Sequence, residues 1–155
     1  MRGANYGRSK KKEKILFLCT HNSARSQMAE GFLRAFYGDR YEAFSAGTEP
    51  TAVHPLTLRV MGEMGIDISG HRAKNVTDFI HQEVDEVVTV CDQAKESCPF
   101  FPYGKKFVHQ SFPDPGSFQG SEEEKLAFFR KVRDAIRDWV KEQYGPASES
   151  GSMPE

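Results

Sequence analysis

The segment KILFLCTHNSAR, residues 14–25, limits the possible folds of this chain more than any other segment. Its first part, Lys14–Leu18, is a short continuous apolar run, which is typical of a strand buried on both faces. From Arg25 to Tyr37 the apolar residues recur at helical spacing on one face, and Gly38 provides a stop. A buried strand, a short loop and a helix in this order predict a parallel α/β sheet.

The rest of the chain repeats this alternation. Further strands are predicted at 41–47, 85–90 and, more weakly, 105–110, with a helix at 55–65 and a last helix between Ser121 and Gly145. The last helix is the clearest, because Ser121 and Glu124 form a capping box before a long amphipathic run. We therefore predict one α/β domain at 14–144, a doubly wound three-layer sandwich with helices on both faces of a parallel sheet, and flexible termini at 1–13 and 145–155.

Composition sets the class of protein but not its chemistry. A chain of 155 residues with 28 % charged residues and a formal net charge of −1 fits one globular domain and shows no preference for nucleic acid. Since no apolar stretch is long enough to cross a bilayer and no signal peptide is visible, we expect a cytoplasmic monomer without a membrane partner. Its three cysteines are an odd number, which argues against a structural disulfide framework and leaves catalytic or redox chemistry open.

The loop between the first strand and the first helix has the composition of an oxyanion site. Cys19 ends the strand and Arg25 opens the helix, which is where open parallel sheets bind anions. Backbone N–H groups and the helix N-terminus would attract a tetrahedral oxyanion and stabilise a thiolate, the Arg25 guanidinium would hold two oxygens, and Ser26 could donate to the sulfur. The predicted binding residues are Thr20, His21, Asn22, Ser23, Ala24, Arg25 and Ser26, with Cys19 as nucleophile. A cysteine at a strand end is otherwise a small packing residue, but the C-x5-R-S pattern favours the nucleophile.

Through CTHNSARS and the following QMAEG, the chain resembles the low-molecular-weight protein tyrosine phosphatase family from Lys14 to about Tyr144. The resemblance implies a four-stranded parallel sheet, with the anion loop after its first strand and a general-acid aspartate in a late loop. Asp114 in SFPDPG fits that aspartate, because its two flanking prolines would present the carboxyl in a stiff, extended segment. The alternative is that PDPG is only a turn.

Cys91 has no role in a phosphatase. It follows the apolar strand at 85–90, as Cys19 follows its own strand, and in the phosphatase fold these strands are neighbours about 4.8 Å apart. Both thiols should therefore emerge at the same edge of the sheet. We expect Cys91 to reach a species bound covalently to Cys19 after a modest shift of its loop.

Cys98 is predicted to lie farther away. If 92–97 is helical, Cys98 is two turns, about 10 Å, from Cys91, so a disulfide between them requires this segment to unwind. Pro99 would favour such a loop. Inert packing of both cysteines is an alternative. A metal site fits poorly, because the spacing contains no paired C-x2-C, and we expect no metal and no cofactor.

The three cysteines together resemble the thioredoxin-coupled arsenate reductases, which share the phosphatase fold and carry a C…C-x6-C arrangement. The matching residues are Cys19 with Arg25, then Cys91 and Cys98 in VTVCDQAKESCP, then Asp114 in FPDP. The resemblance implies that Cys19 attacks arsenate while Asp114 protonates the departing hydroxide. It also implies that Cys91 attacks Cys19 with release of arsenite, and that Cys98 resolves this bond to a Cys91–Cys98 disulfide, which thioredoxin reduces. Phosphate and sulfate should compete with arsenate as oxyanions.

Three positions depart from the pattern of these relatives. His21 stands where they usually have glycine, which adopts left-handed conformations that histidine adopts only at a cost, and Ala24 stands where some carry another cysteine. We expect His21 to point to solvent; the alternative is that it adds positive charge near the anion at lower pH. Lys74 stands where potassium-stimulated reductases have aspartate, and we expect it to replace the cation by pairing with Glu30, unless it is simply an exposed lysine.

Two other functions stay open. A phosphatase acting on phosphotyrosine or phosphoarginine would keep Cys91 and Cys98 as redox protection for Cys19. Gln27, where such phosphatases often have proline, weakly favours the reductase. A binding module without activity is disfavoured, because the nucleophile, the arginine and the aspartate occur together.

Overall fold

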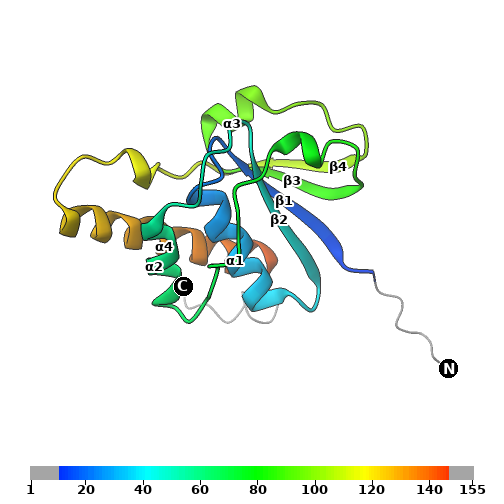
Figure 1. Cartoon of the computed structure of the whole chain (residues 1–155). Coiled ribbons are helices and arrows are strands. Elements are labelled where there is room, and N and C mark those ends of the chain that lie inside the picture. The colour runs from blue at the N-terminus through cyan, green and yellow to red at the C-terminus, as the bar shows by residue number, and fades with distance from the viewer. Residues whose placement is uncertain (1–10, 147–155) are drawn as a thin grey trace.

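The computed structural model describes residues 11–146, and in this part of the chain four parallel strands form one sheet in the order β2-β1-β3-β4 (Figure 1). The strands are β1 Glu13–Cys19, β2 Tyr41–Gly47, β3 Val84–Thr89 and β4 Gly104–His109. The four predicted strands are confirmed, with ends that differ by one residue at most. β1 and β3 are hydrogen-bonded neighbours, with Leu18 paired to Thr89, so the segments that follow them leave the sheet side by side.

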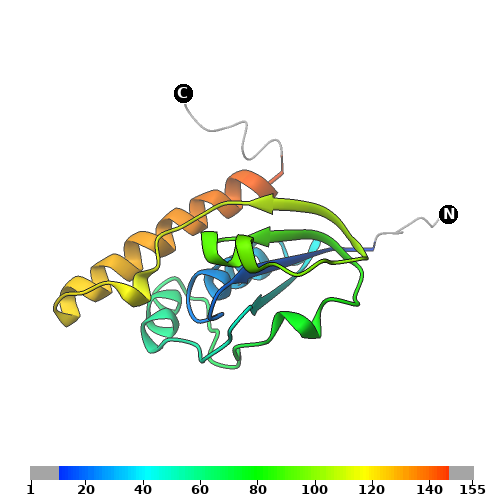
Figure 2. The same ribbon diagram turned by 90° about the horizontal axis from the view of Figure 1, so that it is seen from above.

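Helices cover both faces of this sheet (Figures 1 and 2). The long helices α1 Arg25–Tyr37 and α4 Glu122–Tyr144 pack together on one face, with α2 Pro55–Gly62 beside α4. The short helix α3 Asp92–Ser97 and the 3₁₀ turn η2 Val76–Asp78 lie over the other face, and a second 3₁₀ turn, η3 Pro115–Ser117, precedes α4. This is the predicted three-layer α/β sandwich.

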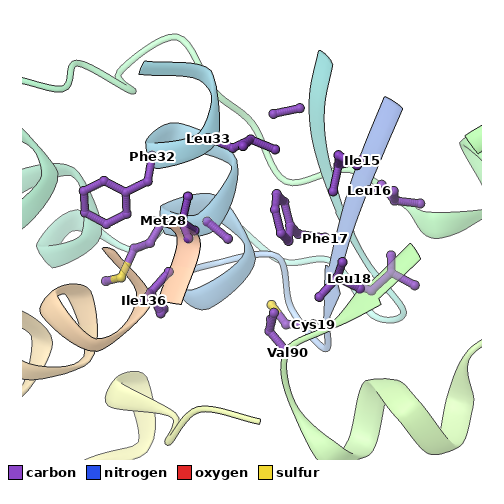
Figure 3. Packing of buried hydrophobic residues seen from close by; sticks show 14 of the residues in the cluster. Ile15, Leu16, Phe17, Leu18, Cys19, Met28, Phe32, Leu33, Val90 and Ile136 are labelled. Atoms are coloured by element: carbon purple, nitrogen blue, oxygen red, sulfur yellow. The ribbon is translucent and has the colours of Figure 1, made fainter. Parts of the chain in front are cut away.

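β1 forms the centre of the core (Figure 3). Its residues Ile15, Leu16, Phe17 and Leu18 are completely buried. The ring of Phe17 meets the edges of Trp139 and Tyr144 from α4, with centroids 6.4 and 6.2 Å apart. Burying each such side chain contributes about 1.5–3 kcal/mol to stability. The strand is therefore a stiff base for the loop that begins where it ends.

The predicted start of α4 agrees with the structure, whereas the predicted end of α2 does not. The capping box of Ser121 and Glu124 is present as predicted. The predicted end of α2 at Gly65 is wrong, because the helix ends at Gly62. The chain there makes a tight turn in which Gly65, at φ +77°, adopts the left-handed conformation, and Ile66 donates back to the carbonyl of Met61 at 3.1 Å.

β1 and α4 are the first and last elements that the structure describes. Glu13 already belongs to β1, where it pairs with Tyr41, and Gly145 closes α4 by donating to the carbonyl of Lys141. The predicted flexible termini otherwise fall largely on residues 1–10 and 147–155, which lie outside the described residues. Within residues 11–146 we find no helix with the length and apolar character to cross a membrane.

Candidate active site

The loop of residues 19–25, between β1 and α1, turns its carbonyl groups away from its interior. Four of these carbonyls accept hydrogen bonds of 2.8 to 3.2 Å from backbone N–H groups of the segment 48–54: Cys19 from Thr48, Thr20 from Glu49, His21 from Thr51 and Ser23 from His54. The backbone N–H groups from 21 to 25 donate no hydrogen bond within the described part of the chain. They are available to an oxyanion held inside the loop.

The thiol of Cys19 lies at the base of this loop and is only 2 % exposed. Its Sγ is 3.0 Å from Oγ of Ser26. Because the Ser26 oxygen accepts a hydrogen bond from Nδ2 of Asn22 at 2.8 Å, the serine can direct its own hydrogen to the sulfur. A donated hydrogen bond of this kind stabilises a thiolate over a thiol.

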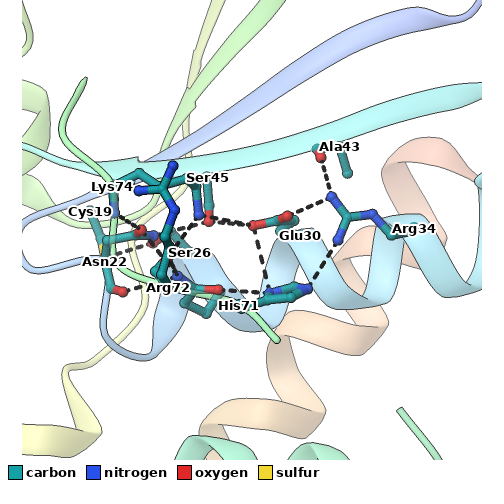
Figure 4. Close-up of polar contacts among 11 residues, drawn as sticks. Cys19, Asn22, Ser26, Glu30, Arg34, Ala43, Ser45, His71, Arg72 and Lys74 are labelled. Atoms are coloured by element: carbon teal, nitrogen blue, oxygen red, sulfur yellow. Dashed lines mark hydrogen bonds and ion pairs between the residues drawn. The ribbon is translucent and has the colours of Figure 1, made fainter. Parts of the chain in front are cut away.

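Asn22 holds the loop in shape (Figure 4). It has a positive φ of 52°, which asparagine tolerates better than most residues. Its buried side chain donates to the hydroxyls of Ser26 and Ser45 at 2.8 and 3.0 Å and accepts from the N–H of Lys74 at 2.8 Å. Gln27 adds hydrogen bonds to both oxygens of Asn22, at 3.0 and 3.2 Å.

His21 does not adopt the left-handed backbone conformation that would be costly for a histidine at a position where relatives have glycine. Its side chain is exposed, and among the described residues other than glycine a positive φ occurs only at Asn22. The close approach is made instead by Gly47 at the end of β2, where a Cβ atom would lie 2.6 Å from the Thr20 carbonyl oxygen and 2.9 Å from the Asn22 nitrogen. Glycine leaves the space that the loop needs.

Behind the loop, the buried carboxylate of Glu30 joins α1 to β2 (Figure 4). Ser45 donates to its Oε1 at 2.5 Å, and Arg34 donates to its Oε2 at 2.6 Å. Nζ of Lys74 lies 3.9 Å from Oε1 and donates to the Arg72 carbonyl at 2.8 Å. The ammonium group of Lys74 is therefore beside Glu30, as expected, at the distance of a charge interaction and not of a hydrogen bond.

His71 fills the remaining space next to this carboxylate. Its Nε2 lies 3.0 Å from an Arg34 nitrogen, and its Nδ1 lies 2.9 Å from Oε1 of Gln27. Because arginine can only donate, Nε2 accepts and Nδ1–H donates to Gln27, which describes a neutral ring. Burial lowers the pKa of His71, in agreement with this assignment.

The predicted nucleophile, arginine and aspartate line one cavity of about 250 Å³. Arg25 is buried; it donates to the Phe112 carbonyl at 3.1 Å, and its other terminal nitrogen lies 3.8 Å from Oδ2 of Asp114. Asp114 accepts from the N–H of Gly116 at 2.9 Å, which fixes its carboxyl at the rim. A tetrahedral anion over Cys19 would meet a guanidinium on one side and a carboxyl group on another.

His54 lines the same cavity, and the sequence analysis did not identify it. It stands at the N-terminus of α2, before Pro55, and its ring accepts a hydrogen bond from the N–H of Leu56. The sequence signal here is Pro55, because proline is favoured at the first position of a helix, and it marks His54 only as the residue before the helix. Its position at the cavity depends on the long-range hydrogen bond to Ser23, which no local pattern reveals.

Cys91 lies beside the loop, one strand across from Cys19. It is 4 % exposed, and its Sγ is 3.4 Å from Oγ1 of Thr20. It caps α3, because its sulfur also accepts from the N–H of Ala94 at 3.4 Å. The two thiols thus emerge at the same edge of the sheet, as expected.

Cys98 lies at the other end of α3, which is helical as the sequence suggested. Its side chain is partly buried against the core, and its thiol donates a long hydrogen bond, 3.5 Å, to the carbonyl of Pro99. Burial raises the pKa of the Cys98 thiol. All three cysteines are free thiols, and α3 keeps Cys98 apart from Cys91.

In residues 11–146 no group of three or more histidine, cysteine, aspartate and glutamate side chains is arranged to hold a metal ion.

The chain has known counterparts in sequence and in fold. The family model described as low molecular weight phosphotyrosine protein phosphatase matches residues 14–144. The arsenate reductase of Halalkalibacterium halodurans is 45 % identical over 130 residues, which are 84 % of this chain and 94 % of the relative.

Solved structures give the same result. An arsenate reductase in the phosphate binding state superposes with a TM-score of 0.72 at 32 % identity, covering 83 % of this chain and 94 % of that one. The thioredoxin-dependent arsenate reductase of Corynebacterium glutamicum superposes with a TM-score of 0.61 at 27 % identity, covering 86 % of this chain and 64 % of that one.

Proposed function

The chain belongs to the low molecular weight phosphotyrosine protein phosphatase family, and the relatives described above are arsenate reductases. On this premise we propose that the protein reduces arsenate to arsenite with Cys19, Cys91 and Cys98. The observation that carries the proposal is the position of Cys91, buried 3.4 Å from the Thr20 hydroxyl at the edge of the Cys19 loop. Hydrolysis of a phosphate ester at Cys19 does not require a second thiol beside the loop. Reduction of arsenate does, because a second thiol must attack the sulfur of Cys19.

The first step takes place in the cavity. The Cys19 thiolate attacks arsenic, and a sulfur–arsenic bond forms while an oxygen departs. Loop N–H groups and Arg25 neutralise the charge on the remaining oxygens, and Asp114 delivers a proton to the departing one. The oxidation state of arsenic does not change in this step.

The second step reduces arsenic. The Cys91 thiolate attacks the sulfur of Cys19, and a sulfur–sulfur bond forms. The electron pair of the sulfur–arsenic bond passes to arsenic, which leaves as arsenite. The hydroxyl of Thr20, 3.4 Å from the Cys91 sulfur, could stabilise the Cys91 thiolate by donating a hydrogen bond to it.

The third step transfers the disulfide from the Cys19–Cys91 pair to the Cys91–Cys98 pair. Cys98 attacks Cys91 and releases the Cys19 thiolate, leaving a Cys91–Cys98 disulfide. Because α3 separates the two residues, it must unwind for this bond to form. Unwinding also exposes Cys98 and removes the burial that raises its pKa.

Thioredoxin is the proposed reductant of this disulfide, since the relative from Corynebacterium glutamicum is thioredoxin-dependent. We propose that the protein acts as a monomer in the cytoplasm, where its three thiols stay reduced. Phosphate and sulfate should compete with arsenate for the loop.

Phosphatase activity is a second candidate, favoured by one observation. Cys19, Arg25 and Asp114 line one cavity, and these groups are sufficient to cleave a phosphate monoester. We expect slow hydrolysis of aryl phosphates as a side activity.

The test compares two reactions in three proteins. Arsenate-dependent NADPH consumption is measured with thioredoxin and thioredoxin reductase, and p-nitrophenyl phosphate hydrolysis is measured beside it. Cys91→Ser and Cys98→Ser should abolish arsenate turnover and leave hydrolysis unchanged. A wild-type protein that cleaves the aryl phosphate but turns over no arsenate would be a phosphatase, and the reductase proposal would fail.

A further inference from the structure

His54 presents a fixed imidazole to the cavity that contains the nucleophile. Its backbone N–H donates to the Ser23 carbonyl at 3.0 Å, which joins it directly to the anion loop. Its ring packs on the buried ring of Phe129, with centroids 4.7 Å apart. The imidazole therefore has little freedom to turn.

The protonation of this ring follows from its contacts. Nδ1 accepts a hydrogen bond from the backbone N–H of Leu56 at 3.0 Å. Because an amide N–H can only donate, Nδ1 is the unprotonated nitrogen, and the neutral ring carries its hydrogen on Nε2. Burial lowers the pKa of His54, opposed by the negative charge of Asp114, so the ring is neutral near pH 7.

The Nε2 edge of the ring faces the segment that carries Asp114. A Cβ atom placed on Gly116 would lie 4.0 Å from Cδ2 of His54, and Cδ2 is bonded to Nε2 on the side of the ring away from Nδ1. Within residues 11–146 no group accepts a hydrogen bond from this Nε2. A neutral donor thus lies at the cavity without a protein partner.

We propose that Nε2–H of His54 donates a hydrogen bond to the oxyanion bound over Cys19, on the side of the anion that faces Asp114. Loop N–H groups and Arg25 serve the other oxygens. A neutral donor on the Asp114 side binds an oxygen there without adding charge and without removing the proton that Asp114 must deliver. This inference rests on the proposed oxyanion chemistry and adds a substrate-binding residue to it.

Two substitutions separate this role from helix capping. His54→Asn keeps an acceptor at the position of Nδ1 and is a preferred N-cap, but it has no donor that reaches the cavity. His54→Gln carries an amide donor at about the reach of Nε2, while its longer side chain is a poorer cap. Capping alone predicts that the Asn variant is normal and the Gln variant impaired, whereas ligand binding predicts the reverse.

The probe is inorganic phosphate, titrated calorimetrically into the full reduced chain, with the Tm of each variant measured alongside. The dissociation constant should rise about fivefold in His54→Asn, the effect of one lost neutral hydrogen bond, and stay within about twofold of wild type in His54→Gln. Wild-type affinity in His54→Asn, or equal weakening in both variants, overturns the proposal.

A second measurement uses the wild-type protein alone. Nitrogen NMR of the imidazole should report the Nε2–H tautomer, and phosphate should shift the Nε2 resonance more than that of Nδ1. An unmoved Nε2 resonance at saturating phosphate also overturns the proposal. Arsenate turnover is measured separately, so its absence would remove the reductase proposal while the phosphate data decide the role of His54.

Discussion

The Cys19 loop and the segment from Cys91 to Tyr103 leave the sheet side by side, but they are held very differently. In the loop, Asn22 and Ser26 are completely buried and joined by side-chain hydrogen bonds of 2.8 to 3.0 Å. The second segment contains a six-residue helix capped by a 3.4 Å contact to sulfur, and its Phe100 and Tyr103 are 81 % and 56 % exposed. The loop is held by several buried hydrogen bonds. The second segment is anchored by Cys91, Ala94 and Phe101, which are buried, but the outer face of its short helix is exposed and its cap is a weak contact.

This difference matches the two tasks that the proposed reaction divides between them. A rigid tetrahedral anion is bound best by donors that are already in place, because no energy is then spent in ordering them. A segment that must bring Cys98 to Cys91 needs the opposite property, since local unfolding costs least where buried contacts are few. The predictions that follow test each half of this contrast.

The largest effect is expected from removing the side chain that orders the loop. Asn22→Ala leaves several buried partners without hydrogen bonds, at about 1–3 kcal/mol, and places alanine in a left-handed conformation, at about 1–2 kcal/mol. We expect arsenate reduction and p-nitrophenyl phosphate hydrolysis to fall together, by about 100-fold for a loss of about 3 kcal/mol from the bound transition state. Steady-state kinetics on both substrates would measure this.

Asn22→Gly is the matched control. Glycine removes the same hydrogen bonds but relieves the left-handed strain, so it should lie between wild type and the alanine variant in both activity and Tm. Near-normal activity in both variants would show that the hydrogen bonds of Asn22 do not order the loop. The contrast between the two regions would then not hold for the Cys19 loop.

The next effect concerns α3. Glu96→Gly destabilises this helix by about 1 kcal/mol relative to Glu96→Ala, and Glu96 is exposed, so little else changes. If the helix must unwind to form the Cys91–Cys98 disulfide, the glycine variant should form it more readily. Its reduction potential should then be more negative by about 20 mV in a glutathione redox titration. Equal potentials in the two variants would mean that α3 stays folded in the oxidised protein.

Sequence patterns were sufficient to predict the strand–loop–helix geometry of the Cys19 loop, because the residues that build it are close together in the sequence. The nucleophile, arginine and serine lie within eight positions of one another, and the flanking apolar runs define the strand and helix that present them. The partners behind the loop are different. Ser45 meets Asn22 only because β1 and β2 pair in parallel with Phe17 opposite Ser45, a register that follows from the folded sheet.

Two other features required the folded structure. The end of α2 was misplaced because Gly62 and Gly65 are both plausible stops. The choice between them is made by Ile66, which returns against α1 near Gly31. His54 was missed because its contacts, Ser23 and Phe129, come from elements far away in the sequence.

A smaller effect is expected from cations. Nζ of Lys74 lies 3.9 Å from Oε1 of Glu30, so a positive charge already stands beside the carboxylate with which we expect it to replace a cation. Wild-type arsenate turnover should be the same in potassium and sodium salts at matched ionic strength. Lys74→Asp should become potassium-stimulated, by no more than about fivefold if the charge contributes about 1 kcal/mol. Clear stimulation of the wild type would show that Lys74 is only a partly exposed lysine.

The smallest effect concerns α2, the helix that begins beside His54, and tests how firmly it is held against α4. Glu63 at its C-terminal end accepts hydrogen bonds from Arg130 at 2.6 Å and Arg133 at 2.8 Å, both on α4. These hydrogen bonds lower the pKa of Glu63 to about 2 from a usual value of 4.5. A depressed carboxyl pKa stabilises the fold fully above about 4.5, and this contribution is lost as the pH falls from there through about 2.

The free energy of unfolding, measured by urea denaturation between pH 6 and pH 2.5, should therefore fall more steeply in wild type than in Glu63→Gln, and the curves should converge at the acid end. The difference should shrink in high salt, because the pair is partly open to solvent. Asp92, at the start of α3, and His109 form the comparable contact in the second region, at 2.9 Å, with the Asp92 side chain 80 % exposed. Asp92→Asn should change this pH dependence much less, because solvent already competes for that carboxylate. A larger effect from Asp92→Asn than from Glu63→Gln would contradict this ranking of the two contacts.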